Sequence, residues 1–233
     1  MIKEMVDIPM SKISQALSVS RTTGLLYLGL AVSGIISYLG IRSQIYTEGN
    51  PAETVSKLLD KQGLARFGVA FELLIVLTQA LAALWFYKLF KKLDSFAAMA
   101  LAVFGIINSV AILIASTFWL NALNSAIASD SIGLTYNLFT IHNDIWLVAT
   151  LFFGLWLIPM GYLARKALMP KALAGFLIVG GYLYLASTFI LVLLPNQNNL
   201  ADSMTIPGTI GEFWIIGYLI FKSPKTYEKS VVI

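Results

Sequence analysis

The sequence predicts an all-α membrane protein, a bundle of six transmembrane helices with its N- and C-termini in the cytoplasm. Composition is the first observation behind this prediction: of 233 residues, 58% are hydrophobic and only 12% are charged, and the mean hydropathy is +0.80. A soluble domain carries about twice that charged fraction. The second observation is that Lys and Arg fall in short clusters between apolar runs, a pattern typical of membrane topogenesis. We therefore expect lipid to solvate much of the surface.

Composition also excludes several functions. The chain has no cysteine, which excludes a disulfide framework, a thiolate metal site and a Cys nucleophile. Its net charge is +4, but the basic residues are spread along the chain between the apolar runs, so nucleic-acid binding has no support. We find no dinucleotide, P-loop, zinc-protease or serine-hydrolase motif. No cofactor is predicted.

Six apolar stretches approach the roughly 20 residues that a membrane-spanning helix needs. They are 22–41, 64–87, 95–120, 138–164, 172–194 and 208–221. We therefore divide the chain into an N-terminal segment, 1–21, a transmembrane domain, 22–222, and a cytoplasmic tail, 223–233. Met10, Ile13 and Leu17 fall at helical spacing in the first segment, which predicts an amphipathic helix at the inner interface.

The distribution of basic residues sets the orientation. All but four of the 16 Lys and Arg lie at the N-terminus, in the second and fourth loops or in the tail. The other four are Arg42, Lys57, Lys61 and Arg66. The positive-inside rule therefore places both termini in the cytoplasm, and the protein is expected to be a multi-pass protein of the cell membrane. No strict GxxxG motif occurs, and no pattern specifies an oligomeric state.

The first outer loop is the only long one, and it contains the signals of a short helix over 50–62. Asn50 and Pro51 suit the N-cap and the first turn, and Gly63 suits the end. Its apolar edge is formed by Val55, Leu58 and Leu59. We expect this helix to lie across the outer mouth of the bundle, as a lid or as a segment resting on the interface.

Four ionisable side chains fall inside the predicted spans: Glu72, His142, Asp144 and Glu212. At 1.5 Å per residue, they lie roughly 10, 6, 9 and 6 Å from the outer ends of their helices. An ionisable group in lipid costs free energy unless it has a partner or contacts water, so each of the four is a candidate site residue. All four belong to the outer half of the membrane.

The similar predicted depths of these ionisable residues indicate that they form a cluster. We expect Glu72, His142 and Glu212 to converge on one outward-facing polar cavity, because ionisable groups are less costly together than apart, with Arg66 or Arg42 near its rim. If a metal binds, these same three residues are its candidate ligands. Asp144 is about 200° around the helix from His142, so it is expected to point elsewhere.

Structural roles for these residues also stay open. Glu72 suits a bridge to Arg66 or Arg42, and His142 suits a hydrogen-bonded packing role. Glu212 begins the sixth predicted span, where an acid favourably meets the helix dipole.

Short motifs in a fixed order resemble the membrane-protein family catalogued as domain of unknown function 4386. They are 21–28 and Arg42 at the first span, 66–68 and Glu72 in the second, 89–91 after it, His142 and 153–154 in the fourth, 169–171 before the fifth, 194–195 after it, and 211–212 in the sixth. Where this family usually has an aspartate in the second helix, the chain has Glu72, which keeps the charge. The resemblance implies six helices and assigns no activity.

Three functions remain open from the sequence. The first is a binding, sensing or accessory membrane protein that takes a small ligand or partner into the outer cavity. The second is a transporter of ions or small molecules that uses intramembrane carboxylates. The third is a membrane-embedded hydrolase-type enzyme with a His/carboxylate site. Transport requires a polar path through the inner half, where the sequence offers little beyond Asn108 and Ser109.

Overall fold

The computed structural model describes residues 10–194 and 196–224, and this part of the chain is helical with no strand. Six segments are long and apolar enough to cross a membrane. The helices are α1 (Met10–Gly34), η1 (Ile35–Arg42), α2 (Ser43–Ile45), α3 (Pro51–Asp60), α4 (Gln62–Phe90), α5 (Ser95–Ile127), α6 (Ile132–Lys166), α7 (Lys171–Leu193) and α8 (Asn198–Phe221). The predicted six-helix transmembrane fold is confirmed.

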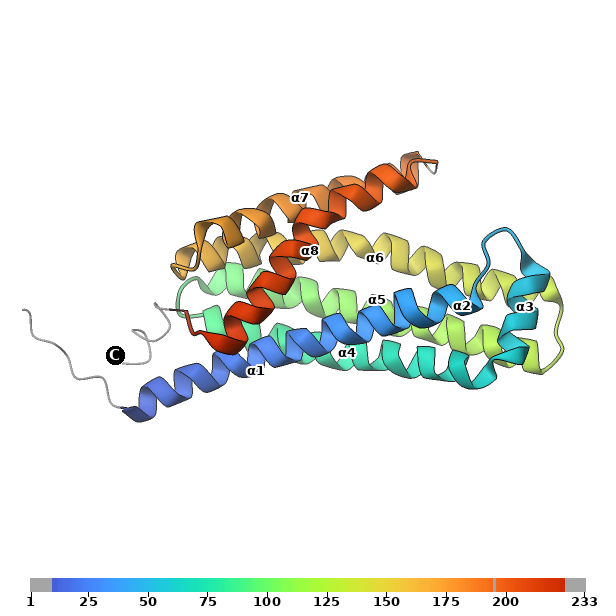
Figure 1. Ribbon diagram of the computed structural model, residues 1–233, viewed down its shortest axis with the longest axis horizontal. Helices are drawn as coiled ribbons and strands as arrows, with labels where there is room; N and C mark the ends of the chain where they lie inside the picture. The colour runs from blue at the N-terminus through green and yellow to red at the C-terminus, as the bar shows by residue number, and fades with distance from the viewer. Residues whose placement is uncertain (1–9, 195, 225–233) are drawn as a thin grey trace, which may run out of the picture.

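Each long helix packs against the next one in the chain, and α1 closes the bundle against α4 and α8. Both described ends of the chain lie at one end of the bundle, which we call the terminal end (Figure 1). The short helix α3 lies at the opposite end, which we call the α3 end. Toward the α3 end, α7 and α8 diverge from α1 and α6 (Figure 1).

The first membrane-spanning segment has two features that the sequence did not predict. Helix α1 begins at Met10 and runs without a break into the first span, so residues 10–21 continue that span rather than forming a separate helix. Residues 1–9 and 225–233 lie outside the described residues. The last turns of the first span form η1, a π-helix over Ile35–Arg42. Such wide turns are rare and are frequent at functional sites.

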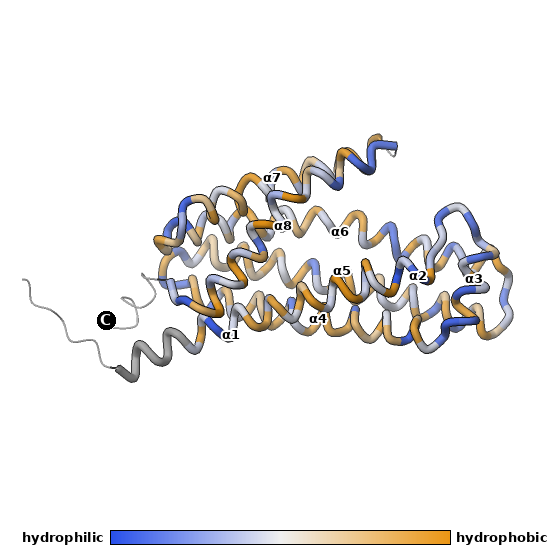
Figure 2. Tube along the Cα trace, viewed as in Figure 1, coloured by the Kyte–Doolittle hydropathy of each residue, from blue (hydrophilic) through white to orange (hydrophobic). Residues whose placement is uncertain are grey.

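The sixth helix is longer than its apolar run. It begins at Asn198, ten residues before the predicted span 208–221, because its first turns carry polar residues that lower the local hydropathy (Figure 2). Glu212 therefore lies about 20 Å from the N-terminal end of α8, rather than roughly 6 Å. The estimate of about 6 Å counted from the start of the apolar run, whereas the helix itself begins ten residues earlier.

Apolar side chains fill the interior and cover the outside. Tyr27, Phe86 and Trp156 meet edge to face near the terminal end, with ring centroids 5.5–5.8 Å apart. Many large apolar side chains nevertheless point outward, such as Phe96 and Phe221 at 75% and 81% exposure. Water would not tolerate so much exposed apolar surface, and a lipid bilayer is the environment that these helices suit.

The helix α3 lies where the sequence predicts one. The Asn50 side chain accepts a hydrogen bond from the Glu53 backbone N–H at 3.1 Å, which caps the first turn. Val55 and Leu58 are buried, whereas Leu59 is 40% exposed. The Lys57 side chain, which bonds Glu53, lowers the pKa of that carboxyl. The helix thus turns one apolar edge onto α5 and α6.

At the terminal end, Asp94 joins the α4–α5 loop to the last turn of α6. Its carboxylate accepts the Ala97 backbone N–H at the start of α5 and bonds Lys166 at 2.9 Å and Tyr162 at 3.0 Å. These contacts, the Ala97 bond first, lower the pKa of Asp94 to about 2. The α4–α5 loop is therefore tied to α6 at neutral pH.

Candidate functional site

A cavity of about 780 Å³ lies between α1 and η1 on one side and α6, α7 and α8 on the other. Its middle is lined by aliphatic and aromatic side chains, and its two ends carry polar groups. Glu48, Asp144, Asn198 and Asp202 are exposed and mark its mouth at the α3 end. A pocket of this size and mixed lining is typical of a small-molecule site.

The polar wall of the cavity comes from one face of α8. Residues on this face recur at alternating intervals of four and three, which keeps them in register on a helix. They are Asn198, Asp202, Thr205, Thr209 and Glu212. The neighbouring Gly208 faces Gly180 of α7 so closely that a Cβ at Gly180 would lie 2.3 Å from the Gly208 Cα. This contact sets how α8 presents its polar face.

Glu212 lies on the floor of the cavity. The Tyr27 hydroxyl donates a hydrogen bond of 2.5 Å to its carboxylate. The Trp156 indole N–H donates in turn to the Tyr27 hydroxyl oxygen at 3.2 Å. Beyond these groups the aromatic cluster of Tyr27, Phe86 and Trp156 closes the bundle toward the terminal end.

Arg42, the last residue of η1, lines the cavity near its mouth. Its Nε donates a hydrogen bond of 2.6 Å to the Asn143 side-chain oxygen on α6. Its guanidinium carbon lies 4.5 Å from the ring centre of Tyr38 and 5.6 Å from that of Tyr46. The π-helix thus directs Arg42 and Tyr38 toward α6.

Behind the cavity wall, Glu72 of α4 and His142 of α6 form a fully buried pair. The Glu72 Oε1 lies 2.7 Å from the His142 Nε2, and the same oxygen accepts the Trp146 indole N–H at 2.8 Å. The second carboxylate oxygen, Oε2, is buried and has no partner among the described residues. Trp146 lines the cavity, whereas Glu72 and His142 do not.

Both nitrogens of His142 face oxygen acceptors. Nε2 faces the Glu72 carboxylate, and Nδ1 lies 3.2 Å from the Asn143 Oδ1, which the Arg42 donor identifies as the amide oxygen. A chain of contacts therefore runs from Glu72 through His142 and Asn143 to Arg42.

The structure separates the residues that the sequence placed in one cluster. Glu72 and His142 meet, but Glu212 is held through Tyr27 at the level of Trp156, roughly four turns and about 20 Å along α6 from His142. The structure thus brings Glu72 and His142 together and holds Glu212 in a separate set of contacts. In the described part of the chain no three His, Cys, Asp or Glu side chains come close enough to hold a metal ion.

The sequence predicted Arg66 or Arg42 near the rim of the cavity, and the structure places one of the two there. Arg42 lines the cavity, but Arg66 is exposed on α4 and is not among the lining residues. Asp144, expected to point away from His142, is exposed and lines the mouth of the cavity. The side of α6 that lines the cavity carries Asn143, Leu147 and Thr150, and Asp144 and Trp146 lie on either side of it.

Sequence reasoning missed two contributors to the site. The first is Trp146, which shares a helix face with His142. From the sequence, a tryptophan in a membrane helix is expected in the aromatic belt at the membrane interface or in the core. The polar face of α8 has a detectable signal, the alternating four- and three-residue spacing from Asn198 to Glu212, which the hydropathy of whole windows conceals.

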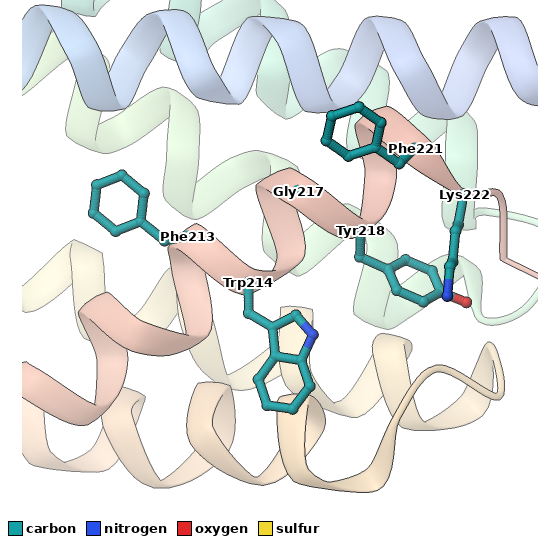
Figure 3. Close-up of a pocket in the computed structure, with 6 residues that line it drawn as sticks. All are labelled: Phe213, Trp214, Gly217, Tyr218, Phe221 and Lys222. Atoms are coloured by element: carbon teal, nitrogen blue, oxygen red, sulfur yellow. The ribbon is translucent and has the colours of Figure 1, made fainter.

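A second, smaller hollow of about 330 Å³ lies on the outer surface of α8 near the terminal end. It is lined by Phe213, Trp214, Gly217, Tyr218, Phe221 and Lys222 (Figure 3). The Lys222 side chain lies beside the Tyr218 ring, with its Nζ 6.0 Å from the ring centre. Aromatic rings with a basic residue are typical of a membrane interface.

The fold and the cavity define a multi-pass helical membrane protein with an amphipathic pocket between its helices. The chain belongs to the family described as domain of unknown function DUF4386, whose model matches residues 22–223. This confirms the family resemblance of the sequence motifs. No curated protein and no solved structure matches the chain.

Proposed function

We propose that this protein is a ligand-binding protein of the cell membrane that takes a small amphiphilic molecule into the cavity. The observation that carries the proposal is the cavity of about 780 Å³ with polar groups at both ends and an apolar middle. Such a lining suits a molecule with an apolar body and a polar head. Glu212 and Arg42 are the charged contacts at the floor and near the mouth.

In this proposal Glu72 and His142 are positioning residues. They do not line the cavity, but the Glu72 carboxylate holds the Trp146 indole N–H. His142 contacts the Asn143 side chain that also bonds Arg42. The pair thus supports two groups that face the ligand, Trp146 and Arg42.

Binding is favoured over the two alternatives by the shape of the cavity. A transporter needs a second path to the terminal end, whereas the aromatic cluster of Tyr27, Phe86 and Trp156 lies below the floor. A hydrolase of the predicted His/carboxylate type needs its histidine within reach of the ligand, whereas the Glu72–His142 pair is buried behind the wall.

The clustering of basic residues at the terminal end supports an outward-facing mouth. Because the chain has no cysteine, single cysteines introduced at Ala52 and Lys171 report the side of each end without background. We expect a membrane-impermeant maleimide to label Ala52→Cys in intact cells. Lys171→Cys should be labelled only after permeabilisation, and the reverse pattern would place the mouth in the cytoplasm.

A bulky substitution at Gly34 tests ligand binding by filling part of the cavity. Gly34 lines the cavity, and a Cβ there would meet no atom within 4 Å, so Gly34→Phe places a ring in open space. Gly175 of α7 also has no neighbour within 4 Å but does not line the cavity, so Gly175→Phe is the matched control.

The binding experiment uses radiolabelled phenylbutyl probes with a cationic, a neutral and an anionic head, with the protein in lipid nanodiscs and empty nanodiscs as background. We expect at least one probe to bind wild type and Gly175→Phe saturably and to lose about tenfold or more in affinity in Gly34→Phe, since the ring occupies part of the pocket. Equal binding to both variants, or no saturable binding of any probe, contradicts the proposed function.

A further inference from the structure

We propose that the ligand of this cavity is an organic cation, whose ammonium group sits on the floor against the Glu212 carboxylate and beside the rings of Tyr184 and Phe153. This inference rests on the proposed function and names its ligand class. It is carried by an intramembrane carboxylate that has no counter-charge among the described residues, by two aromatic rings that line the same cavity and by the charge of the cavity wall.

Glu212 lacks the partner that an intramembrane carboxylate normally has. Charged groups at membrane depth are paired with opposite charges or with water. The partner of Glu212 in the described part of the chain is a neutral hydroxyl, that of Tyr27. Among the described residues that line the cavity, Arg42 is the one cation, and it lies about four turns from Tyr27 along α1 and η1, about 20 Å away. A bound cation supplies the missing counter-charge.

Aromatic rings complete the site around this carboxylate. Tyr184 and Phe153 both line the cavity, and their ring centres lie 6.3 Å apart. The Tyr184 ring packs on Gly208, one turn before Glu212 on α8. The face of an aromatic ring attracts an ammonium group, most strongly where water is excluded. A carboxylate beside such rings is the chemistry that recognises quaternary and tertiary amines.

The net charge of the residues that line the cavity is also negative. Four carboxylates line the cavity, those of Glu48, Asp144, Asp202 and Glu212, against the single guanidinium of Arg42. None of the four forms an ion pair with Arg42 in the described residues, where that side chain bonds Asn143 and stacks on Tyr38. Acidic groups at a mouth raise the local concentration of cations and oppose anions.

The apolar middle sets the rest of the ligand. Aliphatic residues of α1, η1, α6 and α7 form the wall between the mouth and Glu212, among them Leu30, Ala31, Ile35, Leu147 and Leu191. A simple metal cation gains nothing from such a surface, whereas a hydrocarbon body gains by burial. The geometry therefore points to an amphiphilic amine and not to an inorganic ion.

The test compares phenylbutyltrimethylammonium with its tert-butyl isostere, in which carbon replaces nitrogen, and with the phenylbutyl sulfonate. The cation and the isostere have nearly the same shape, so a difference in their affinity reports the charge. For wild type in nanodiscs we expect the cation to bind about tenfold more tightly than the isostere, and the sulfonate to bind weakest. Glu212→Gln keeps an acceptor for the Tyr27 hydroxyl, and it should bring the cation and the isostere to similar affinities.

Two further variants control the comparison. Glu212→Asp keeps the charge, so it should keep a preference for the cation. Asp130→Asn removes the same charge from an exposed residue at the α3 end that does not line the cavity, so it should leave the preference unchanged. Thermal unfolding of each variant without probe confirms that it is folded.

Some results overturn the inference while the proposed function stands. These are an isostere or sulfonate that binds wild type as tightly as the cation, or a preference for the cation that survives in Glu212→Gln. If no probe binds in a manner sensitive to Gly34→Phe, both the inference and the proposed function fail.

Discussion

Replacing Glu72 by alanine is expected to lower the free energy of unfolding by several kcal/mol, since each buried donor left without its acceptor costs about 1–3 kcal/mol. The substitution leaves two buried donors without their acceptor, the His142 Nε2 and the Trp146 indole N–H. Neither is exposed enough to recover a bond with water, since His142 is fully buried and Trp146 is 8% exposed. Unfolding in detergent, followed by temperature or denaturant, measures the loss.

Glu72→Gln is the matched control for this prediction. Its amide oxygen can still accept both N–H groups, so only the charge is lost and the loss of stability should be clearly smaller. A double-mutant cycle with His142→Ala should give a favourable coupling energy, because the two side chains share one short contact. If Glu72→Ala were as stable as wild type, the pair would have no structural role.

Gly180→Ala is expected to destabilise the contact between α7 and α8. It is also expected to weaken binding of the phenylbutyl probes to the protein in nanodiscs. A methyl group there would lie 2.3 Å from the Cα and 2.4 Å from the backbone N of Gly208, and backbone atoms cannot swing aside as a side chain does. Overpacking of this kind typically costs about 1–3 kcal/mol. Because α8 carries Glu212 and the other polar residues of the wall, its displacement should also lower probe affinity.

Gly175→Ala on the same helix is the control that separates this clash from the general effect of replacing a glycine in a helix. A methyl group at Gly175 meets nothing within 4 Å, so we expect thermal stability and probe affinity close to those of wild type. Equal melting temperatures and affinities for the two alanine variants would show that the crossing of α7 and α8 tolerates the added volume, against the prediction.

The six spans and the family were predictable because both depend on the order of residues along the chain. Lipid requires long apolar helices, so composition alone identifies most of each span. The family resemblance rests on short motifs in order, and the family model confirms it over residues 22–223. Asn50 and Pro51 likewise indicate α3, since cap chemistry is local.

The extent of α8 was partly visible in the sequence. Its first turns are too polar for a hydropathy window, although Asp202, Thr205 and Thr209 keep helical spacing up to Glu212. A polar stripe on a membrane helix indicates a face turned to a cavity. The apolar run from 208 alone therefore placed Glu212 too close to the outer end of the helix.

The order of residues is enough to predict the class of protein, the six spans and the residues whose charge is unusual in a membrane. How these residues are paired depends on the packing of the helices. Glu72 meets His142 and Trp146 behind the wall, while Glu212 meets Tyr27 on the floor. Side-chain spacing fixes direction around one helix, but the rotation and divergence of helices depend on packing such as that of Gly180 on Gly208. These contacts join residues distant in the chain, and no local pattern records them.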